Sequence, residues 1–279
     1  MLKRVFAALA GTAVLPASPA ARQHRSPSPT EAAAITRRLR HRIATLFSLA
    51  AASGLALTAL APTQAGATAF SGSGCAQVNI IVARASTEAQ GEGITGNLAS
   101  QVQSNSAQTV STEAVVYPAT LNNYASSESQ GVQNAEQELS TAVSNCPNQK
   151  QVLMGYSQGA NVVLDVVTGN AEVHPSIVVG PASSTNLSHV VAIVGFGDPG
   201  HIVKQAWDVG TDTTTNGRFP RSSTQLQALT NFGAGTSTRS WCDTGDPFCA
   251  GGNNLNTHLT YLNRYQNAAA SFVVGRIGG

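Results

Sequence analysis

The stretch of sequence that decides the fold is QVLMGYSQGANVVLDVV, residues 151–167. Its first part, up to Met154, is a short apolar run that predicts a buried strand, and the part after Gly159 is able to turn as a helix. Between them stands GYSQG, a serine between glycines at a strand-to-helix turn. Such a turn lifts the hydroxyl of Ser157 clear of the sheet, and the glycines leave room for neighbouring backbone. The stretch therefore predicts a nucleophilic serine at the end of a strand.

Runs of strand and helix character alternate on both sides of this turn. Further strands are expected over residues 78–82, 114–117 and 190–196, and helices over residues 96–106, 127–144 and 259–274. Alternating strands and helices predict an α/β fold with a mostly parallel sheet covered by helices on both faces. Active sites in such folds lie at the carboxyl ends of the strands, where the turn places Ser157.

Basic residues are concentrated at the start of the chain. Residues 1–67 carry eight Lys and Arg and one acid, whereas residues 68–279 carry eight Lys and Arg and thirteen acids. The overall positive charge therefore belongs to the first segment alone. Because the remainder is acidic, we expect no nucleic-acid partner.

The first segment has the features of a targeting sequence. Basic residues at 37–42 precede a mostly apolar run at 43–60, and Ala65-Gly66-Ala67 has the small-x-small pattern of a cleavage site. We predict a signal peptide cleaved after Ala67 and one mature, secreted domain over residues 68–279. Residues 1–20 also have signal-like character. The apolar run is rich in Ala, Ser and Gly, so no stable membrane anchor is expected, and we expect the domain to be a monomer.

All four cysteines lie beyond the leader, at positions 75, 146, 242 and 249. An even number in a secreted chain predicts two disulfides, for which three pairings exist. The short separation of Cys242 and Cys249 favours a local bridge, which leaves Cys75 with Cys146. The sequon at residues 186–188 offers a glycosylation site in addition.

The sequence favours neither a cofactor nor a metal. Residues 91–96, GEGITG, match the G-x-G-x-x-G pattern, but they stand well after the preceding strand. In a dinucleotide-binding turn the glycines follow the strand at once. No Cys-x-x-Cys or His-x₃-His spacing of a zinc site occurs. We therefore expect chemistry carried by side chains alone.

A serine hydroxyl needs a base to become a nucleophile. In α/β hydrolases the acid and then the histidine follow the serine along the chain. His258 is the histidine near the end of the chain, in a loop before the last expected helix. His174, His189 and His201 come earlier, although His201 does follow an acid. We interpret His258 as the base.

Three aspartates compete for the role of the acid that orients this histidine. Asp246 lies between Cys242 and Cys249, where a disulfide would hold its carboxylate in one place. Asp243 shares this loop, and Asp198 follows an expected strand within a Gly-Asp-Pro turn. We favour Asp246.

The negative oxygen of the reaction intermediate needs hydrogen-bond donors. One donor is expected from the backbone N–H of Gln158, directly after the nucleophile. A second is expected from the loop after the first strand, where Ser86 offers both its N–H and its hydroxyl. Ser86 and Gln158 are therefore the predicted oxyanion hole.

Across nearly all of residues 75–275 the chain resembles the cutinase family, which also contains acetylxylan esterases. The resemblance rests on Cys75 before the first strand, ARASTE at 83–88, YPA at 117–119, GYSQG at 155–159, GDP at 197–199, and Cys242-x₃-Asp246-x₂-Cys249 followed by His258. Several motifs in one order at family spacing are more specific than any one of them.

The resemblance implies a compact three-layer α/β/α sandwich without a large lid. It implies a Ser157–His258–Asp246 triad, an oxyanion hole of Ser86 and Gln158, and bridges Cys75–Cys146 and Cys242–Cys249. It further implies a secreted esterase that needs no cofactor.

The resemblance leaves the substrate open. Cutinases usually have Gly at the position of Ala85, and many have aliphatic residues before the histidine, where residues 251–257 are polar except for Leu255. That segment is closer to the acetylxylan esterase type, whereas Ser-Thr-Glu at 86–88 is closer to cutinase. We predict hydrolysis of cutin or other aliphatic polyesters, with acetylated xylan as the alternative and a non-catalytic binding protein as a third reading. Leu121, Tyr124, Leu187 and Leu255 are candidate rim residues for the acyl chain.

Overall fold

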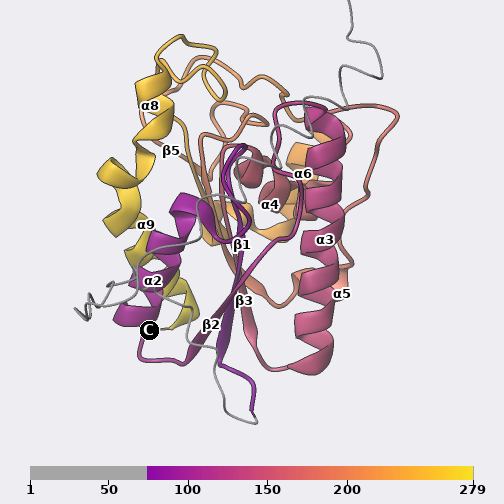
Figure 1. Ribbon diagram of the computed structural model, residues 1–279, viewed down its shortest axis with the longest axis vertical. Helices are drawn as coiled ribbons and strands as arrows, with labels where there is room; N and C mark the ends of the chain where they lie inside the picture. Colours follow the sequence, from indigo (N-terminus) through magenta and orange to yellow (C-terminus); the bar gives the residue numbers. More distant parts are fainter. Residues whose placement is uncertain (1–73, 279) are drawn as a thin grey trace, which may run out of the picture. The chain divides into compact units, whose positions relative to one another are not determined.

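The computed structural model describes residues 74–278, so the predicted leader and its cleavage site lie outside the described residues. Six parallel strands form one sheet with the order β2-β1-β3-β4-β6-β5. In Figure 1 the neighbouring strands β1, β2 and β3 run between α2 and α3. The strands are β1 (Val78–Ala83), β2 (Val110–Ala114), β3 (Lys150–Tyr156), β4 (Val190–Phe196), β5 (Asp208–Val209) and β6 (Thr238–Trp241). The sheet order places β3, which leads to Ser157, near the middle.

Helices follow or separate the strands. They are η1 (Gly93–Thr95), α2 (Gly96–Asn105), α3 (Tyr124–Asn145), α4 (Gln158–Thr168), α5 (Ser184–Leu187), α6 (Ser223–Phe232), α7 (Ala234–Ser237), α8 (Leu255–Leu259) and α9 (Tyr261–Ile277). Within residues 74–278, none of these helices has the length and apolarity needed to cross a membrane.

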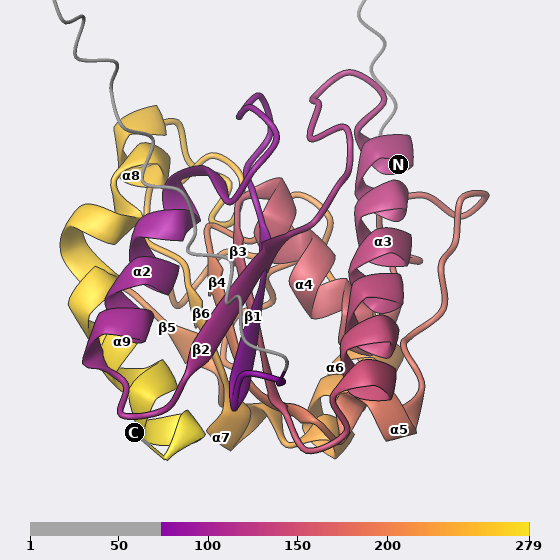
Figure 2. The ribbon, with the colours of Figure 1, turned by 60° about the horizontal axis from the view of Figure 1, so that its bottom comes forward.

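The sheet is the middle layer of three. Helices α2 and α9 lie on one face, and α3, α4 and α6 lie on the other (Figure 2). All six residues of β1 are buried. Ile80 and Val82 contribute to the core beneath α2 and α9, while Ile81 and Ala83 contribute to the core beneath α3 and α4. The predicted α/β/α arrangement of a mostly parallel sheet is confirmed.

The expected strand over 114–117 was wrong in position. The strand is β2, a half-buried edge strand with the polar sequence VSTEA that ends at Ala114. Of the apolar residues that follow it in a loop, Val115 and Tyr117 are buried and Val116 is exposed, and the carbonyls of Val115 and Tyr117 accept hydrogen bonds from the Arg84 guanidinium at 3.4 and 2.6 Å. The run has the apolar, β-branched composition of a strand, but the Arg84 side chain binds two of its carbonyls in place of a neighbouring strand.

The expected tail helix was also revised. The structure divides it into α8 and α9, which meet at Thr260, and places His258 within α8 rather than in a loop. Helix α6 and the short strands β5 and β6 were not predicted. Strands of two and four residues carry too little periodicity to be recognised along a sequence.

Two disulfides brace the described chain. Cys75, just before β1, is bonded to Cys146 at the end of α3. Cys242 and Cys249 close the loop that follows β6. The second bridge lies next to the predicted acid, Asp246, and limits where its carboxylate is able to go.

Candidate active site

Ser157 stands at a strained turn between β3 and α4. Its backbone has φ 55° and ψ −119°, a conformation that residues other than glycine rarely adopt. A Cβ at Gly155 would lie 2.1 Å from the carbonyl oxygen of Gly159, and one at Gly159 would lie 2.0 Å from that of Ala83. Both flanking glycines are therefore required by close backbone packing, which allows the serine to project from the turn.

His258 reaches the serine from α8. Its Nε2 lies 2.9 Å from Ser157 Oγ, and the residue is only 4% exposed. The Tyr156 hydroxyl donates to the His258 carbonyl, and the Phe248 ring lies 4.5 Å from the imidazole, centroid to centroid. These contacts hold the imidazole beside Ser157 Oγ.

Asp246 holds the other side of the imidazole. Its Oδ2 lies 2.7 Å from His258 Nδ1, while its Oδ1 accepts the backbone N–H groups of Phe248 at 2.7 Å and Cys249 at 3.1 Å. Burial raises the pKa of Asp246, but the hydrogen bond and charge of His258 and the two backbone N–H groups outweigh it and lower that pKa below its usual value. An ionised Asp246 keeps the proton on Nδ1, so that Nε2 is free to accept the proton of Ser157.

The two rival aspartates are engaged elsewhere. Asp198 pairs with Arg221 and accepts the N–H of Gly200 at 2.8 Å. Asp243 accepts hydrogen bonds from Arg264 Nε at 3.0 Å and from the Tyr265 hydroxyl at 2.9 Å. Of the three candidates, the structure brings Asp246 to His258.

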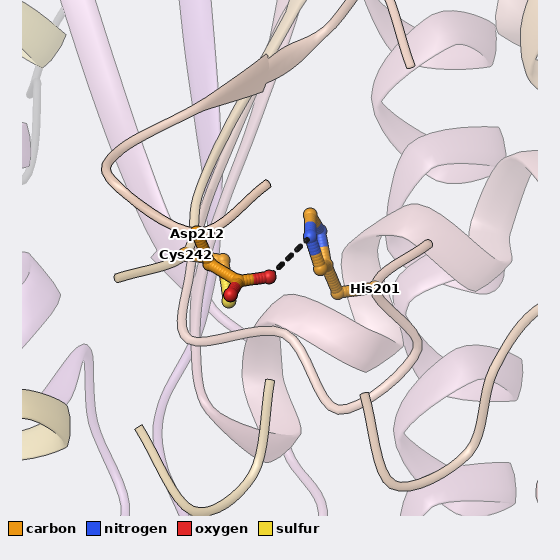
Figure 3. A group of neighbouring side chains, drawn as sticks. All are labelled: His201, Asp212 and Cys242. Atoms are coloured by element: carbon orange, nitrogen blue, oxygen red, sulfur yellow. Dashed lines mark ion pairs between the residues drawn. The ribbon is translucent and has the colours of Figure 1, made fainter. Parts of the chain in front are cut away.

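The earlier histidine His201 belongs to a separate buried group. Its Nδ1 lies 3.6 Å from Asp208. Its Nε2 lies 3.9 Å from Asp212, with Cys242 close by (Figure 3). Burial lowers the pKa of His201 despite the nearby carboxylates. Because the Cys242 sulfur is bonded to Cys249, it is no thiolate ligand, and this group does not form a convincing metal site.

The predicted oxyanion residues face each other across the turn. Ser86 Oγ donates to the side-chain oxygen of Gln158 at 3.0 Å. The loop that carries Ser86 is held by Arg84, whose Nε donates to the Glu88 carbonyl at 2.9 Å, and by the Glu88 carboxylate, which accepts the Ala85 N–H at 2.7 Å. The methyl group of Ala85 packs against the core, so the residue that departs from the family pattern is accommodated there.

Gly197 is a site residue that the sequence reasoning did not single out as such. It has φ +61°, and a Cβ at this position would lie 2.7 Å from His258 Cε1 and 3.2 Å from Asp246 Oδ2. The GDP motif at 197–199 was a signal for it, although the motif draws attention to its aspartate. The end of β4 therefore passes so close to the histidine that only glycine leaves room.

Tyr261, in α9, is a second such residue. Its hydroxyl donates to Asp246 Oδ2 at 2.8 Å and accepts the backbone N–H of Asp243 at 2.8 Å. The same carboxylate oxygen contacts His258, so Tyr261 is a positioning residue that acts through the acid. Its spacing from His258 on the last helical segment was visible in the sequence, but nothing there showed which way the hydroxyl pointed.

We expect the Tyr261→Phe variant to shift the pH dependence of the reaction. With one donor fewer, Asp246 presents more negative charge to the imidazolium formed when His258 takes a proton, which favours the protonated histidine. The acid limb of kcat/KM should therefore move to higher pH, by up to about one unit. The free energy of unfolding, measured in urea, should be about 1–3 kcal/mol lower in this variant, because the backbone N–H of Asp243 loses its acceptor.

Tyr265→Phe is the matched control, since the Tyr265 hydroxyl binds Asp243 and not Asp246. Its acid limb should stay in place. An unchanged limb in Tyr261→Phe beside a loss of stability would reduce Tyr261 to a purely structural role.

A cavity of about 300 Å³ opens beside the serine. It is lined by Leu121, Tyr124, Ser157, Pro199, Arg218, Phe219 and Phe248. Tyr124 and Phe219 stack with ring centroids 5.0 Å apart. Of the candidate rim residues, the structure places Leu121 and Tyr124 in this wall, whereas Leu187 lines a different cavity and Leu255 is exposed outside it.

Comparisons with known proteins show the family of the chain. A family model described as Cutinase matches residues 74–277. The acetylxylan esterase of Hypocrea jecorina is 30% identical over 208 residues, which cover 71% of this chain and 67% of that protein. Phospholipase Culp4 of Mycobacterium tuberculosis is 32% identical over 248 residues, covering 88% and 94%. The catalytic core of acetyl xylan esterase from Trichoderma reesei superimposes with a TM-score of 0.64 at 28% identity, covering 72% of this chain and 99% of that structure.

Proposed function

The chain belongs to the cutinase family and is a carboxylic ester hydrolase, and we propose that it is a secreted serine esterase acting on aliphatic esters. The observation that carries the proposal is the contact of Ser157 Oγ with His258 Nε2 at 2.9 Å, beside a largely apolar cavity. The contact supports the serine mechanism, and the cavity supports the aliphatic substrate.

In the proposed reaction, Ser157 Oγ attacks the ester carbonyl carbon while His258 Nε2 takes the hydroxyl proton. The tetrahedral intermediate collapses when the bond to the alcohol oxygen breaks, and His258 returns the proton to that oxygen. Water then attacks the acyl-enzyme with the same help from His258 and releases the acid. Asp246 stays ionised throughout and stabilises the imidazolium.

The negative charge that develops on the carbonyl oxygen is proposed to be stabilised by hydrogen bonds from the backbone N–H groups of Gln158 and Ser86. The Gln158 N–H is the first of α4, where backbone N–H groups lack partners within the helix and the helix dipole favours negative charge. The Ser86 hydroxyl, which donates to the Gln158 side-chain oxygen at 3.0 Å, is proposed to turn toward the same carbonyl oxygen when the ester is bound. Such donors stabilise the transition state more than the ground state.

The acyl group is proposed to lie against the aromatic wall of the cavity. Tyr124, Phe219, Phe248 and Leu121 offer apolar surface, and Leu121 is 56% exposed at its edge. Each methylene group buried there contributes about 0.8 kcal/mol. This wall favours acyl chains longer than acetyl, as in cutin or other aliphatic polyesters.

A second candidate substrate is acetylated xylan. It is favoured by the similarity to proteins named acetylxylan esterase and by the exposed or half-exposed polar side chains over most of residues 251–257, ahead of His258. Polar side chains there suit a polysaccharide better than a wax. The size of the acyl group that the enzyme accepts separates the two substrates.

We expect hydrolysis of p-nitrophenyl esters to rise from acetate to butyrate. The two additional methylene groups should raise kcat/KM by about 10-fold if the wall buries them. The measurement compares acetate, butyrate and palmitate at equal enzyme concentration, with the free nitrophenolate as readout. A steep fall beyond acetate would move the proposal to acetylated xylan, and no hydrolysis of any ester would leave a non-catalytic binding protein.

The secretion of the protein and its oligomeric state are also proposals. The two disulfides are typical of an oxidising compartment and support secretion, together with the predicted signal peptide. We propose a monomer without a stable membrane anchor whose partner is its ester substrate. Immunoblotting of culture medium and size-exclusion chromatography with light scattering test these points.

A further inference from the structure

Arg218 is a cation in the wall of the cavity that contains Ser157. Arg218 is exposed, and within residues 74–278 its guanidinium makes no hydrogen bond or ion pair. The other arginines described each donate from the guanidinium to a carbonyl or carboxylate: Arg84, Arg221, Arg239, Arg264 and Arg276. Arg218 therefore differs from them in having its charge available beside the nucleophile.

The backbone around Arg218 is held in place. Its N–H donates to the Phe248 carbonyl at 2.9 Å, and the next N–H, of Phe219, donates to the Pro199 carbonyl at 2.8 Å. A Cβ at Gly217 would lie 2.3 Å from the same Pro199 oxygen, so the segment packs tightly on the turn that follows β4. The position of the charge is thus set by the loops that also build the cavity.

The carboxylates around the site do not neutralise this charge. Asp246 is bound by His258 and Tyr261, and Asp198 is paired with Arg221. A guanidinium that has no partner within residues 74–278 and lies beside an apolar wall suits an amphiphile with both an aliphatic part and an anionic oxygen group. Guanidinium binds carboxylate and phosphate in a two-pronged geometry that an ammonium group does not match.

We propose that Arg218 is a specificity-determining residue that binds a carboxylate or phosphate group of an aliphatic ester while the ester carbonyl lies at Ser157. This inference rests on the proposed function and narrows its substrate to esters that carry a negative charge within reach of the cavity. In a domain with more acids than bases, Arg218 is the local feature that offsets repulsion of such a substrate.

The test compares pairs of esters that differ in this charge. Mono-p-nitrophenyl adipate and p-nitrophenyl hexanoate have acyl chains with the same number of carbons, and the adipate has a carboxylate in place of the terminal methyl group. The kcat/KM for the adipate divided by that for the hexanoate is expected to be about 10-fold lower in Arg218→Gln than in the wild type. Arg276→Gln, which removes an exposed arginine of α9 outside this cavity, should leave the ratio unchanged.

Dihexanoyl phosphatidic acid compared with dihexanoylglycerol gives the phosphate arm. If only one of the two charged-to-uncharged ratios of kcat/KM falls in Arg218→Gln, the charged ester in that ratio identifies the group bound, carboxylate or phosphate. If both ratios fall, Arg218 is a general anion site. Both ratios unchanged in Arg218→Gln, with hexanoate still hydrolysed by the wild type, would overturn the inference and leave the proposed function intact. Failure of the wild type to hydrolyse hexanoate would instead reject the proposed function itself.

Discussion

Replacing Ser157 by alanine is expected to reduce kcat toward p-nitrophenyl butyrate by about a million-fold, as far as loss of a nucleophile does in serine hydrolases. The hydroxyl is the proposed attacking group, and within residues 74–278 it is the side-chain group that forms a hydrogen bond with His258 Nε2. What remains should be the small acceleration from the oxyanion donors and substrate binding. The same loss should appear in His258→Ala, and the double variant should lose no more than either alone, because the two residues act as a unit.

Thermal unfolding checks that Ser157→Ala is folded, and Ser104→Ala is the matched control. Ser104 lies exposed on α2, where its hydroxyl bonds only to the carbonyl one turn before it. A fluorophosphonate probe should label the wild type and the control at one site and leave Ser157→Ala unlabelled. Substantial turnover by Ser157→Ala would show that the nucleophile lies elsewhere.

Asp246→Asn is expected to lower kcat by about 10⁴-fold with little change in structure, the effect measured for the equivalent change in a serine protease. The backbone N–H groups of Phe248 and Cys249 bind Oδ1, so the amide oxygen of asparagine should take that place. Its NH₂ group then faces His258 Nδ1, where Oδ2 accepted a hydrogen bond before. The imidazole must respond by moving its proton to Nε2, which leaves no base for Ser157.

Asp243→Asn provides a control within the same disulfide loop. Asp243 bonds to Arg264 and Tyr265, so its replacement should cost stability, measurable in urea, and change kcat only slightly. Asp198→Asn is a further control, since that acid pairs with Arg221. If either control lost more kcat than Asp246→Asn, the aspartate replaced in that control would be the acid of the triad instead of Asp246.

The part of the site that was predictable depends on short patterns. The turn at Ser157 was recognisable because the close backbone contacts of Gly155 and Gly159 admit no other residue, which makes the pattern specific. His258 followed from chain order. Asp246 was favoured over Asp243 and Asp198 because a disulfide would hold its carboxylate in place. Spacing alone was unable to exclude the other two, because Asp243 shares the same loop and Asp198 follows a predicted strand.

Sequence by itself determined the α/β/α fold, the position of the serine and the candidate base, since strand and helix periodicity and a sharp glycine turn depend on neighbouring residues. Tertiary structure alone decided that Asp246 faces His258, that Tyr261 binds the same carboxylate, that Gly197 leaves room for the imidazole, and that Arg218 joins an aromatic wall. These contacts join loops after β4 and β6 to α8 and α9. Their geometry depends on how distant segments pack, which no local pattern of residues records.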